Sequence, residues 1–255
     1  MFNNLLEINP QEEVSKIVSF LRQTFSEQKI EKAVIGVSGG IDSAVSLALL
    51  SKVLPVENIK ILHLPYFNEP IDDIEKLLES LEIKKSQLQI FSIKTTADEL
   101  IKELQIPEKD LVRRGNIMAR VRMITLFDNA KKENGLVVGT ENRSEHFLGY
   151  FTRFGDAASD IEPIGHLYKT QVYELAKYLK LPQSIIDKAP SANLWGDQTD
   201  EGQFGFTYKQ ADPVLLLYFD KKNSAYSIEQ MYPGAKKIIE FAQNNAFKLK
   251  VPYSL

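Results

Sequence analysis

The sequence predicts an α/β fold: a doubly wound, mostly parallel sheet flanked by helices, in a single domain that spans residues 1–255. Three observations support this prediction. Short apolar segments of strand length alternate with helical segments, which is typical of parallel sheets with right-handed crossovers. A glycine-rich turn joins the first of these strands directly to a helix. No linker rich in Pro, Gly or Ser divides the chain, and 255 residues with 44% hydrophobic content are enough for one substantial core.

The first predicted helix begins at Asn9. A capping Asn, Pro10 at the first helical position and acidic residues in the first turn favour a helix start here. An apolar stripe follows and indicates one buried face. The members of this stripe are Val14, Ile17, Val18, Leu21 and Phe25. We expect this helix to be structural or to form part of a subunit contact.

The next segment is the most informative part of the chain. Residues 34–37 predict a buried strand, and a helix is expected to start near Asp42. Between them, Gly39 and Gly40 lack a β-carbon, so they can adopt positive φ and let backbone N–H groups converge on one point. The helix directs its free N–H groups and the positive end of its dipole to the same point. This geometry predicts a phosphate or pyrophosphate site.

The loop differs from the two common nucleotide-binding loops. It lacks the Gly-Lys-Ser/Thr ending of a Walker loop, and its glycines do not match the G-x-G-x-x-G spacing of dinucleotide folds. Ser38 and Ser43 offer hydroxyl donors instead. The carboxylate of Asp42 would repel a bound phosphate unless a cation lay between them, so we expect Mg²⁺ to bridge the two. The alternative is that Asp42 only caps the helix.

Further strands and helices alternate along the chain. Strands are expected at 59–64, 88–93 and 136–140, and helices at 44–53, 70–81, 95–104, 113–132 and 170–179. Shorter helical segments at 214–219, 227–231 and 235–246 close the domain. Thr95 or Thr96 is expected to cap one of the helices. His63 falls at the carboxyl edge of the sheet, where it either contacts a nucleotide or, as we favour, is a structural edge histidine.

The long helix at 113–132 has apolar residues on several sides, which indicates burial or an oligomer interface. Arg114, Arg120 and Arg122 stand among these residues, and a buried arginine needs an anionic partner. Internal salt bridges would satisfy them. A polyanionic substrate, shared across a dimer seam, would satisfy them equally well.

A loop rich in glycine and aromatic residues, at 149–156, follows the fourth strand, and Asp160 lies just beyond it. Aromatic rings suit a flat substrate ring, and arginine suits a phosphate or carboxylate. Glu145, in the helix before this loop, is a candidate second ligand for Mg²⁺. The alternative is an ordinary solvated loop.

Three later features also point to a ligand. Lys169 lies near the start of a helix, where its charge opposes the dipole unless an anion such as a leaving pyrophosphate compensates it. Residues 187–208 show no clear period and many polar groups, which predicts a lid that orders over ATP. The basic end of the chain, at 247–252, either reaches a ligand or is a solvated tail.

Composition narrows the function classes. The chain has no cysteine, which excludes disulfides and a Cys nucleophile, so any ammonia it uses would be free or come from a separate protein. A net charge of −3 argues against a nucleic-acid partner. No apolar run approaches the ~20 residues that span a bilayer, and no secretory signal is visible. We therefore expect no membrane partner and a cytoplasmic location.

The string SGGIDS at 38–43 resembles the loop of the ATP pyrophosphatases, which cut ATP between its α and β phosphates and adenylate a substrate. The whole chain is similar to ammonia-dependent NAD synthetases. The strings that carry this resemblance are GVSGGIDS at 36–43, GNIMARVRM at 115–123, VGTENRSE at 138–145, GYFTRFGD at 149–156, PI at 163–164, KAPSANLW at 188–195 and DE at 200–201.

The resemblance implies an adenine nucleotide alpha hydrolase-like fold and a homodimer. It also implies conversion of deamido-NAD⁺, ATP and ammonia to NAD⁺, AMP and pyrophosphate. ATP or its pyrophosphate would contact Gly36, Val37, Ser38, Gly39, Gly40, Ile41, Asp42, Ser43, Thr140, Lys169 and Ser191. Asp42 and Glu145 would hold Mg²⁺. Deamido-NAD⁺ would contact Arg120, Arg153, Asp160 and Lys248.

The chain departs from the family pattern at three places. Arg153 replaces a common Lys, Ser191 replaces a common Thr, and a Phe-Lys-Leu string at 247–249 replaces His-Lys-Arg. The implied catalytic residues are Asp42, which would hold Mg²⁺, and Lys169; Mg²⁺, the N–H groups of the loop and Lys169 would neutralise the departing pyrophosphate. Asp156 is a candidate general base for ammonia. The main alternative is a related enzyme that acts on nicotinate mononucleotide, and a rival of another class is a non-catalytic nucleotide-binding module.

Overall fold

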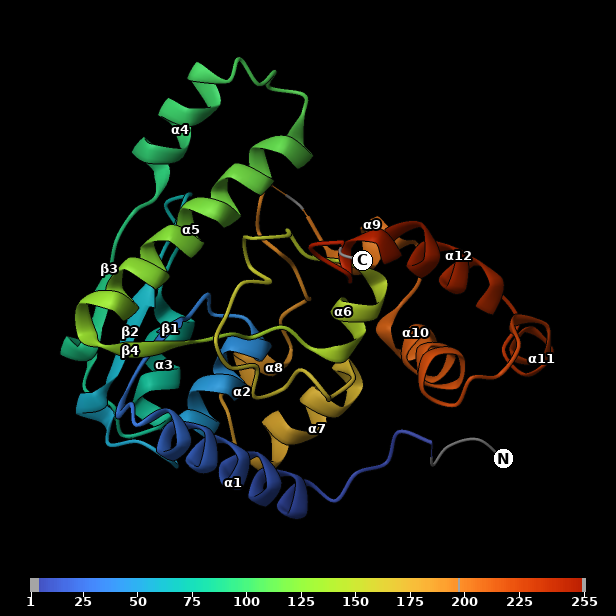
Figure 1. The fold of residues 1–255 in the computed structure, drawn as a ribbon, viewed down its shortest axis with the longest axis horizontal. Helices are drawn as coiled ribbons and strands as arrows, with labels where there is room; N and C mark the ends of the chain where they lie inside the picture. Colours follow the sequence, from blue (N-terminus) through green and yellow to red (C-terminus); the bar gives the residue numbers. More distant parts are fainter. Residues whose placement is uncertain (1–4, 197, 254–255) are drawn as a thin grey trace.

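The computed structural model describes residues 5–196 and 198–253. Its centre is a parallel sheet of four strands in the order β3-β2-β1-β4 (Figure 1). The strands are β1 (Lys32–Gly36), β2 (Ile59–His63), β3 (Leu88–Ile90) and β4 (Gly135–Val138). The predicted α/β class with a parallel sheet is confirmed. Strand positions match the predictions, although β3 ends three residues earlier.

Helices cover both faces of the sheet, as a doubly wound fold requires. One face packs against α1 (Pro10–Gln28), α2 (Ile41–Leu50), α3 (Asp72–Ser80), α7 (Lys169–Tyr178) and α8 (Gln183–Ile186). The other face packs against α4 (Lys94–Glu103) and α5 (Leu111–Glu133) (Figure 1). Alternation along β1 makes this possible, because Ala33 and Ile35 enter the first core and Val34 enters the second.

A third apolar cluster lies beside the sheet and is formed by the C-terminal helices together with α6 (Figure 1). Its elements are α6 (Arg143–Leu148), α9 (Asp200–Phe204), α10 (Tyr208–Leu215), a π-helical turn (Leu216–Asp220), α11 (Ala225–Met231) and α12 (Ala235–Asn245). Aromatic rings fill it, including Phe204, which packs edge-on against Tyr150 and Tyr208. This cluster brings α10 against α6 and α7, next to the carboxyl edge of the sheet.

Local signals explain most helix boundaries. The predicted cap of α1 is confirmed, since the Asn9 side chain accepts hydrogen bonds from the backbone of Gln11 and Glu12. The predicted cap of α4 is wrong: the helix begins one residue earlier, and its N-cap residue Ile93 makes no side-chain bond. The helix predicted at 214–219 starts instead at Tyr208, because Thr207 forms a capping box that the prediction overlooked.

The long helix α5 packs on β1 and β4 through residues such as Met118 and Val121. In the described part of the chain, none of Arg114, Arg120 and Arg122 forms an ion pair with Asp or Glu within 4 Å. Arg122 Nε instead donates to the carbonyl of Leu64 at 3.0 Å. Internal salt bridges therefore do not account for these arginines.

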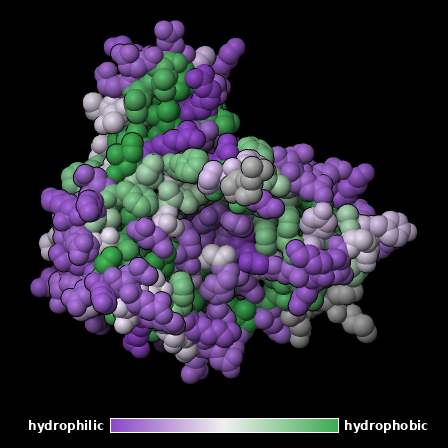
Figure 2. All heavy atoms as spheres, in the orientation of Figure 1, coloured by the Kyte–Doolittle hydropathy of each residue, from purple (hydrophilic) through white to green (hydrophobic). Residues whose placement is uncertain are grey.

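Part of this face is apolar and exposed. Figure 2 shows hydrophobic residues gathered over α4 and the beginning of α5. They include Leu100, Leu104, Leu111 and Val112, of which Val112 is 62% exposed. Among the described residues, no helix is both long and apolar enough to cross a bilayer.

Candidate active site

The candidate site lies where the strand order reverses. β1 and β4 are neighbours in the sheet, yet the chain connects β1 onward to β2 on its other side. The loops that leave β1 and β4 therefore diverge at the carboxyl edge, which is where open α/β sheets bind ligands. The β1 loop leads into α2, and the β4 loop carries Thr140, Glu141 and Asn142 into α6.

The glycine turn has one residue in the left-handed region, which glycine adopts without strain. Gly39 adopts φ +80°, as predicted, whereas Gly40 has φ −91° and serves as the N-cap of α2. The expectation of positive φ at Gly40 is wrong. The serine hydroxyls bind the loop itself: Gly40 N donates to Ser38 Oγ at 3.2 Å, and Ser38 N donates to Ser43 Oγ at 3.2 Å. These hydrogen bonds shape the turn ahead of any ligand.

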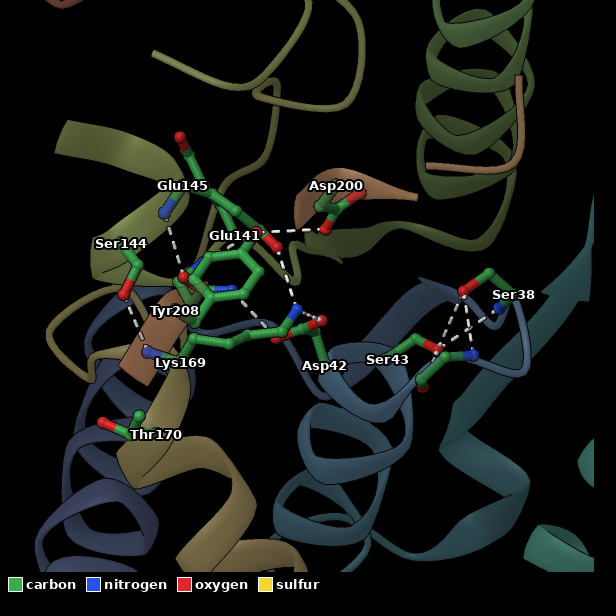
Figure 3. Close-up of polar contacts among 12 residues, drawn as sticks. Ser38, Asp42, Ser43, Glu141, Ser144, Glu145, Lys169, Thr170, Asp200 and Tyr208 are labelled. Carbon is green, nitrogen blue, oxygen red and sulfur yellow. Dashed lines mark hydrogen bonds and ion pairs between the residues drawn. The ribbon is translucent and has the colours of Figure 1, made fainter. Parts of the chain in front are cut away.

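Lys169 connects the first turn of α2 to α6 (Figure 3). Its Nζ donates to Asp42 Oδ2 at 2.5 Å and to Glu145 Oε1 at 3.1 Å. The other oxygen of Asp42 accepts from Asn142 Nδ2 at 2.9 Å. Lys169 is only 2% exposed. Side chains far apart in sequence thus meet at one buried point, and the anions that compensate this lysine come from the protein.

The charges in this cluster stabilise one another. Burial alone would lower the pKa of Lys169, but the carboxylates of Asp42 and Glu145 outweigh it and hold the pKa above its ordinary value. Burial raises the pKa of Glu145 above its ordinary value, and the neighbouring Lys169 ammonium opposes that rise. Lys169 is therefore a cation at neutral pH.

The arrangement fits a hard cation in part. Two carboxylates converge on the Lys169 ammonium, and carboxylate oxygens are the protein ligands that Mg²⁺ prefers. Across the described residues, no group of three or more His, Asp or Glu could hold a metal ion by itself. A metal here would thus take two carboxylates, Asp42 and Glu145, and complete its shell with phosphate oxygens and water, as Mg²⁺ commonly does.

Two residues on the C-terminal side close the cluster. The ring of Tyr208 lies 5.2 Å from Lys169 Nζ, and its hydroxyl donates to Asp200 Oδ2 at 3.0 Å. Asp200 is buried, and its Oδ1 has no hydrogen-bond partner among the described residues. Burial raises the pKa of Asp200, opposed by Lys169. Sequence reasoning gave no role to Tyr208 or Asn142, although the capping pattern from Asn142 to Glu145 was a readable signal.

The predicted substrate residues form a second group. Arg120 donates to the Arg153 carbonyl through Nη2 at 3.3 Å, and the Arg153 guanidinium lies 5.2 Å from the ring centre of Phe247. Lys248 Nζ donates to the carbonyls of Gly149 and Phe151 at 2.7 and 3.0 Å. The C-terminal segment therefore packs on the 149–156 loop.

Other predicted residues have local partners. Asp160 Oδ2 accepts from Val137 N at 2.8 Å, and Asp156 Oδ1 accepts from Thr152 N at 3.0 Å. His63 Nδ1 lies 2.9 Å from the Val37 carbonyl oxygen, which agrees with the structural role that we favoured.

The segment that contains Ser191 begins beside the glycine turn. The Ser191 hydroxyl accepts from Asn193 N at 3.1 Å. Three residues earlier, Lys188 Nζ lies 3.8 Å from the place where a β-carbon on Gly39 would stand. Sequence reasoning missed Lys188, which brings a positive charge to the turn.

Fold and site together define an α/β protein of the class that carries an SGGIDS-type phosphate loop at the switch point of a parallel sheet. The family model described as NAD synthase matches residues 13–252. The chain belongs to the NAD synthase family.

Similar proteins agree with this placement. The curated NH(3)-dependent NAD(+) synthetase of Thermoplasma volcanium is 42% identical over 248 residues, covering 96% of this chain and 97% of that protein. The structure of an NMN synthetase from Francisella tularensis aligns with TM-score 0.82 at 37% identity, covering 98% and 99% of the two chains. An NH3-dependent NAD synthetase from Campylobacter jejuni, in complex with nitrate, aligns with TM-score 0.79 at 32% identity, covering 97% and 100%.

Proposed function

We propose that this protein is an ammonia-dependent NAD⁺ synthetase, a ligase that forms a carbon–nitrogen bond. It would convert deamido-NAD⁺, ATP and ammonia to NAD⁺, AMP and pyrophosphate. The observation that carries the proposal is the cluster of Asp42, Lys169 and Glu145 beside the glycine turn, in a chain that is 42% identical to a curated enzyme of that name.

ATP would bind with its phosphates at the glycine turn, in contact with residues 36–43, Thr140, Lys169 and Ser191. The N-terminus of α2, where Gly40 is the N-cap residue and no side chain caps the helix, supports this placement. Asp42 and Glu145 would hold Mg²⁺, which when bound neutralises charge on the phosphate oxygens. Deamido-NAD⁺ would contact Arg120, Arg153, Asp160 and Lys248.

The residues have separate tasks in the reaction. A carboxylate is a poor electrophile because its leaving group would be oxide, so the nicotinate carboxylate first attacks the α-phosphate of ATP. Negative charge gathers on the departing pyrophosphate, where Lys169 and the N–H groups of the turn stabilise it. Ammonia then displaces AMP from the acyl-adenylate. A closed segment at 187–208 would keep water away from that intermediate.

The further expectations concern the assembly and the location. We propose a homodimer, because apolar side chains on α4 and at the beginning of α5 are exposed. We also propose a cytoplasmic location, ammonia that is free or comes from a separate protein, and no nucleic-acid partner.

A second candidate is amidation of nicotinate mononucleotide. The likeness to the Francisella tularensis NMN synthetase, with TM-score 0.82, favours it. The two substrates share the reacting nicotinate ring and differ in the adenylate half. The same acyl-adenylate chemistry therefore serves either substrate, and only a comparison of rates separates them.

Mass spectrometry of products tests the proposal. The purified chain is mixed with ATP, Mg²⁺ and ammonium, and with either deamido-NAD⁺ or nicotinate mononucleotide. We expect NAD⁺, AMP and pyrophosphate in equal amounts from the first substrate, at a rate well above that of the second. Glutamine in place of ammonium should give no turnover, since the chain has no cysteine to release its nitrogen. A faster reaction of the mononucleotide would favour the second candidate, and no AMP from either would indicate a binding module.

A further inference from the structure

A buried carboxylate behind the site holds the start of the helix that carries Lys169. Asp212 on α10 is fully buried, at 0% exposure. It accepts three hydrogen bonds: from Ser144 Oγ at 2.6 Å, from Thr170 N at 2.8 Å and from Thr170 Oγ1 at 2.7 Å. Ser144 Oγ in turn accepts from Lys169 N at 2.8 Å. All these contacts converge on the first two residues of α7 (Figure 3 shows Ser144, Lys169 and Thr170).

The start of α7 needs this external support. The N-cap residue, Tyr168, offers no side-chain hydrogen bond to the helix. Free N–H groups at a helix start require acceptors, and the positive end of the dipole disfavours a lysine at the first position. Ser144 and Asp212 provide the acceptors, and the Asp212 carboxylate also offsets the dipole. Burial raises the pKa of Asp212 to about 6, opposed by the hydrogen bonds from Ser144 and Thr170, so it is ionised at neutral pH.

The same helix α10 also begins at Tyr208, whose ring lies against the Lys169 ammonium. Helix α10 therefore holds both the backbone and the charged group of Lys169. Asp212 binds the Lys169 backbone through Ser144, and the Tyr208 ring covers the Lys169 ammonium. No part of Asp212 reaches the reacting groups. A shift of about 1 Å at a catalytic group can cost about 100-fold in rate.

We propose that Asp212 is a positioning residue: through Ser144 and Thr170 it sets the start of α7 so that Lys169 meets Asp42 and Glu145. This inference rests on the proposed function and adds to it a residue outside the site. It makes α10, whose first residue Tyr208 ends the 187–208 segment, part of the framework that positions Lys169.

The test is a double-substitution cycle in kcat. Asp212→Asn preserves size but removes the charge and one acceptor, and should lower kcat about 10- to 100-fold while the KM for ATP and for ammonium changes less than about threefold. In a Lys169→Met background, the same substitution should have almost no further effect on kcat, because its only route to the chemistry is gone. Glu133→Gln, which loses a carboxylate that binds Lys32 at the opposite edge of the sheet, is the matched control and should leave kcat unchanged.

Each other outcome counts against the inference. Wild-type kcat in folded Asp212→Asn would overturn it, as would an equal loss in the Lys169→Met background. Should Asp212→Asn fail to fold, Ser144→Ala breaks the same path at the hydroxyl and carries the same expectation. A wild-type enzyme that makes no NAD⁺ would refute the proposed function instead. In that case the same cycle is measured as free energies of unfolding in urea. Additive effects of Asp212→Asn and Lys169→Met on the free energy of unfolding would overturn the positioning role.

Discussion

At the level of single side chains, the centre of this protein is an ion cluster assembled from distant parts of the sequence. Asp42, Glu145 and Lys169 each carry a readable signal: an acid in a phosphate loop, an acid at a helix start and a lysine opposed to a dipole. Sequence reasoning placed all three at one site. It did not foresee that Lys169 pairs with Asp42 and Glu145, because helical periodicity and motif spacing say nothing about contacts between different elements.

Asp42→Asn should lower kcat for pyrophosphate release at least about 100-fold while the fold is retained. The substitution preserves size but removes the charge that Lys169 contacts at 2.5 Å. Steady-state assays at saturating Mg²⁺, with circular dichroism as the check on folding, measure this. Turnover close to that of the wild type would refute the role of Asp42.

Glu162→Gln should change how stability depends on pH. Burial raises the Glu162 pKa to about 8, despite the bond from Ser159, and neighbouring Glu141 adds to the rise. The folded pKa of Glu162 lies above its unfolded value near 4.5. The stability that Glu162 contributes is therefore fully present below about pH 4.5 and is lost as the pH rises through about 8.

The maximal slope from one such group is about 1.4 kcal/mol per pH unit. Urea unfolding of the wild type and of Glu162→Gln is compared at pH 5 and pH 8. The other buried acids with raised pKa values, Glu145 and Asp212, are present in both proteins, so their contributions cancel in the comparison. The wild type should lose at least about 1 kcal/mol more than Glu162→Gln between these pH values. Equal losses would show that Glu162 is ionised in the folded protein.

At the level of elements, the glycine turn could be predicted from adjacent residues, whereas the start of α7 depends on a contact with a distant residue. The turn is local: strand, Gly39 and the N-terminus of α2 are contiguous, so the sequence predicted them together. The start of α10 depends on a capping box at Thr207, and the helix continues through Pro213, whereas the predicted helix began only at 214. The α7 start depends on Asp212, 42 residues away, and no sequence pattern indicates that contact.

Gly39→Ala should weaken ATP binding by about 5- to 10-fold, since a residue with a β-carbon at φ +80° costs about 1 kcal/mol or more. Calorimetric titration with a non-hydrolysable ATP analogue measures the loss. Gly40→Ala is the matched control, because φ at Gly40 is −91° and its effect should be smaller. An unchanged affinity in Gly39→Ala, or a larger loss in Gly40→Ala, would contradict this account of the turn.

Gly149→Ala should destabilise the fold by about 2–4 kcal/mol. Gly149 ends α6 at φ +61°, and an added β-carbon would lie 2.5 Å from Asn245 Cβ on α12. Gly234 has φ +92° with open space around it, so Gly234→Ala carries the backbone strain alone. Thermal or urea unfolding should show the larger loss for Gly149→Ala; equal losses would mean that α12 moves aside without cost.

At the level of the whole molecule, the arrangement of layers was predictable and the C-terminal cluster was not. Alternating strand and helix segments determine a parallel sheet with helices on both faces. The C-terminal segments were predicted as helical, but their packing on α6 and α7 depends on aromatic contacts such as Phe204 with Tyr208. Contacts of this kind between distant residues produce no periodic pattern in the sequence from which they could be predicted.

Self-association should depend on the exposed apolar surface over α4 and α5. Leu104→Glu places a charge in that surface, where Leu104 is 52% exposed, and should weaken a homodimer at least about tenfold. Light scattering coupled to size exclusion measures this across a dilution series. Tyr226→Glu, at a residue 78% exposed on α11, is the control and should leave the dimer intact. A monomeric wild type, or an equal effect of both variants, would refute the proposed interface.

The pairing of Lys169 with two acids has one more consequence. The two acids already share a counter-ion, so in the metal role proposed above a divalent ion that arrives alone would have to displace an ammonium held by contacts of 2.5 and 3.1 Å. An ion that arrives bound to a triphosphate would bring phosphate oxygens that can accept hydrogen bonds from the displaced ammonium. On the metal role proposed above, the lysine would therefore make entry of a divalent ion conditional on nucleotide.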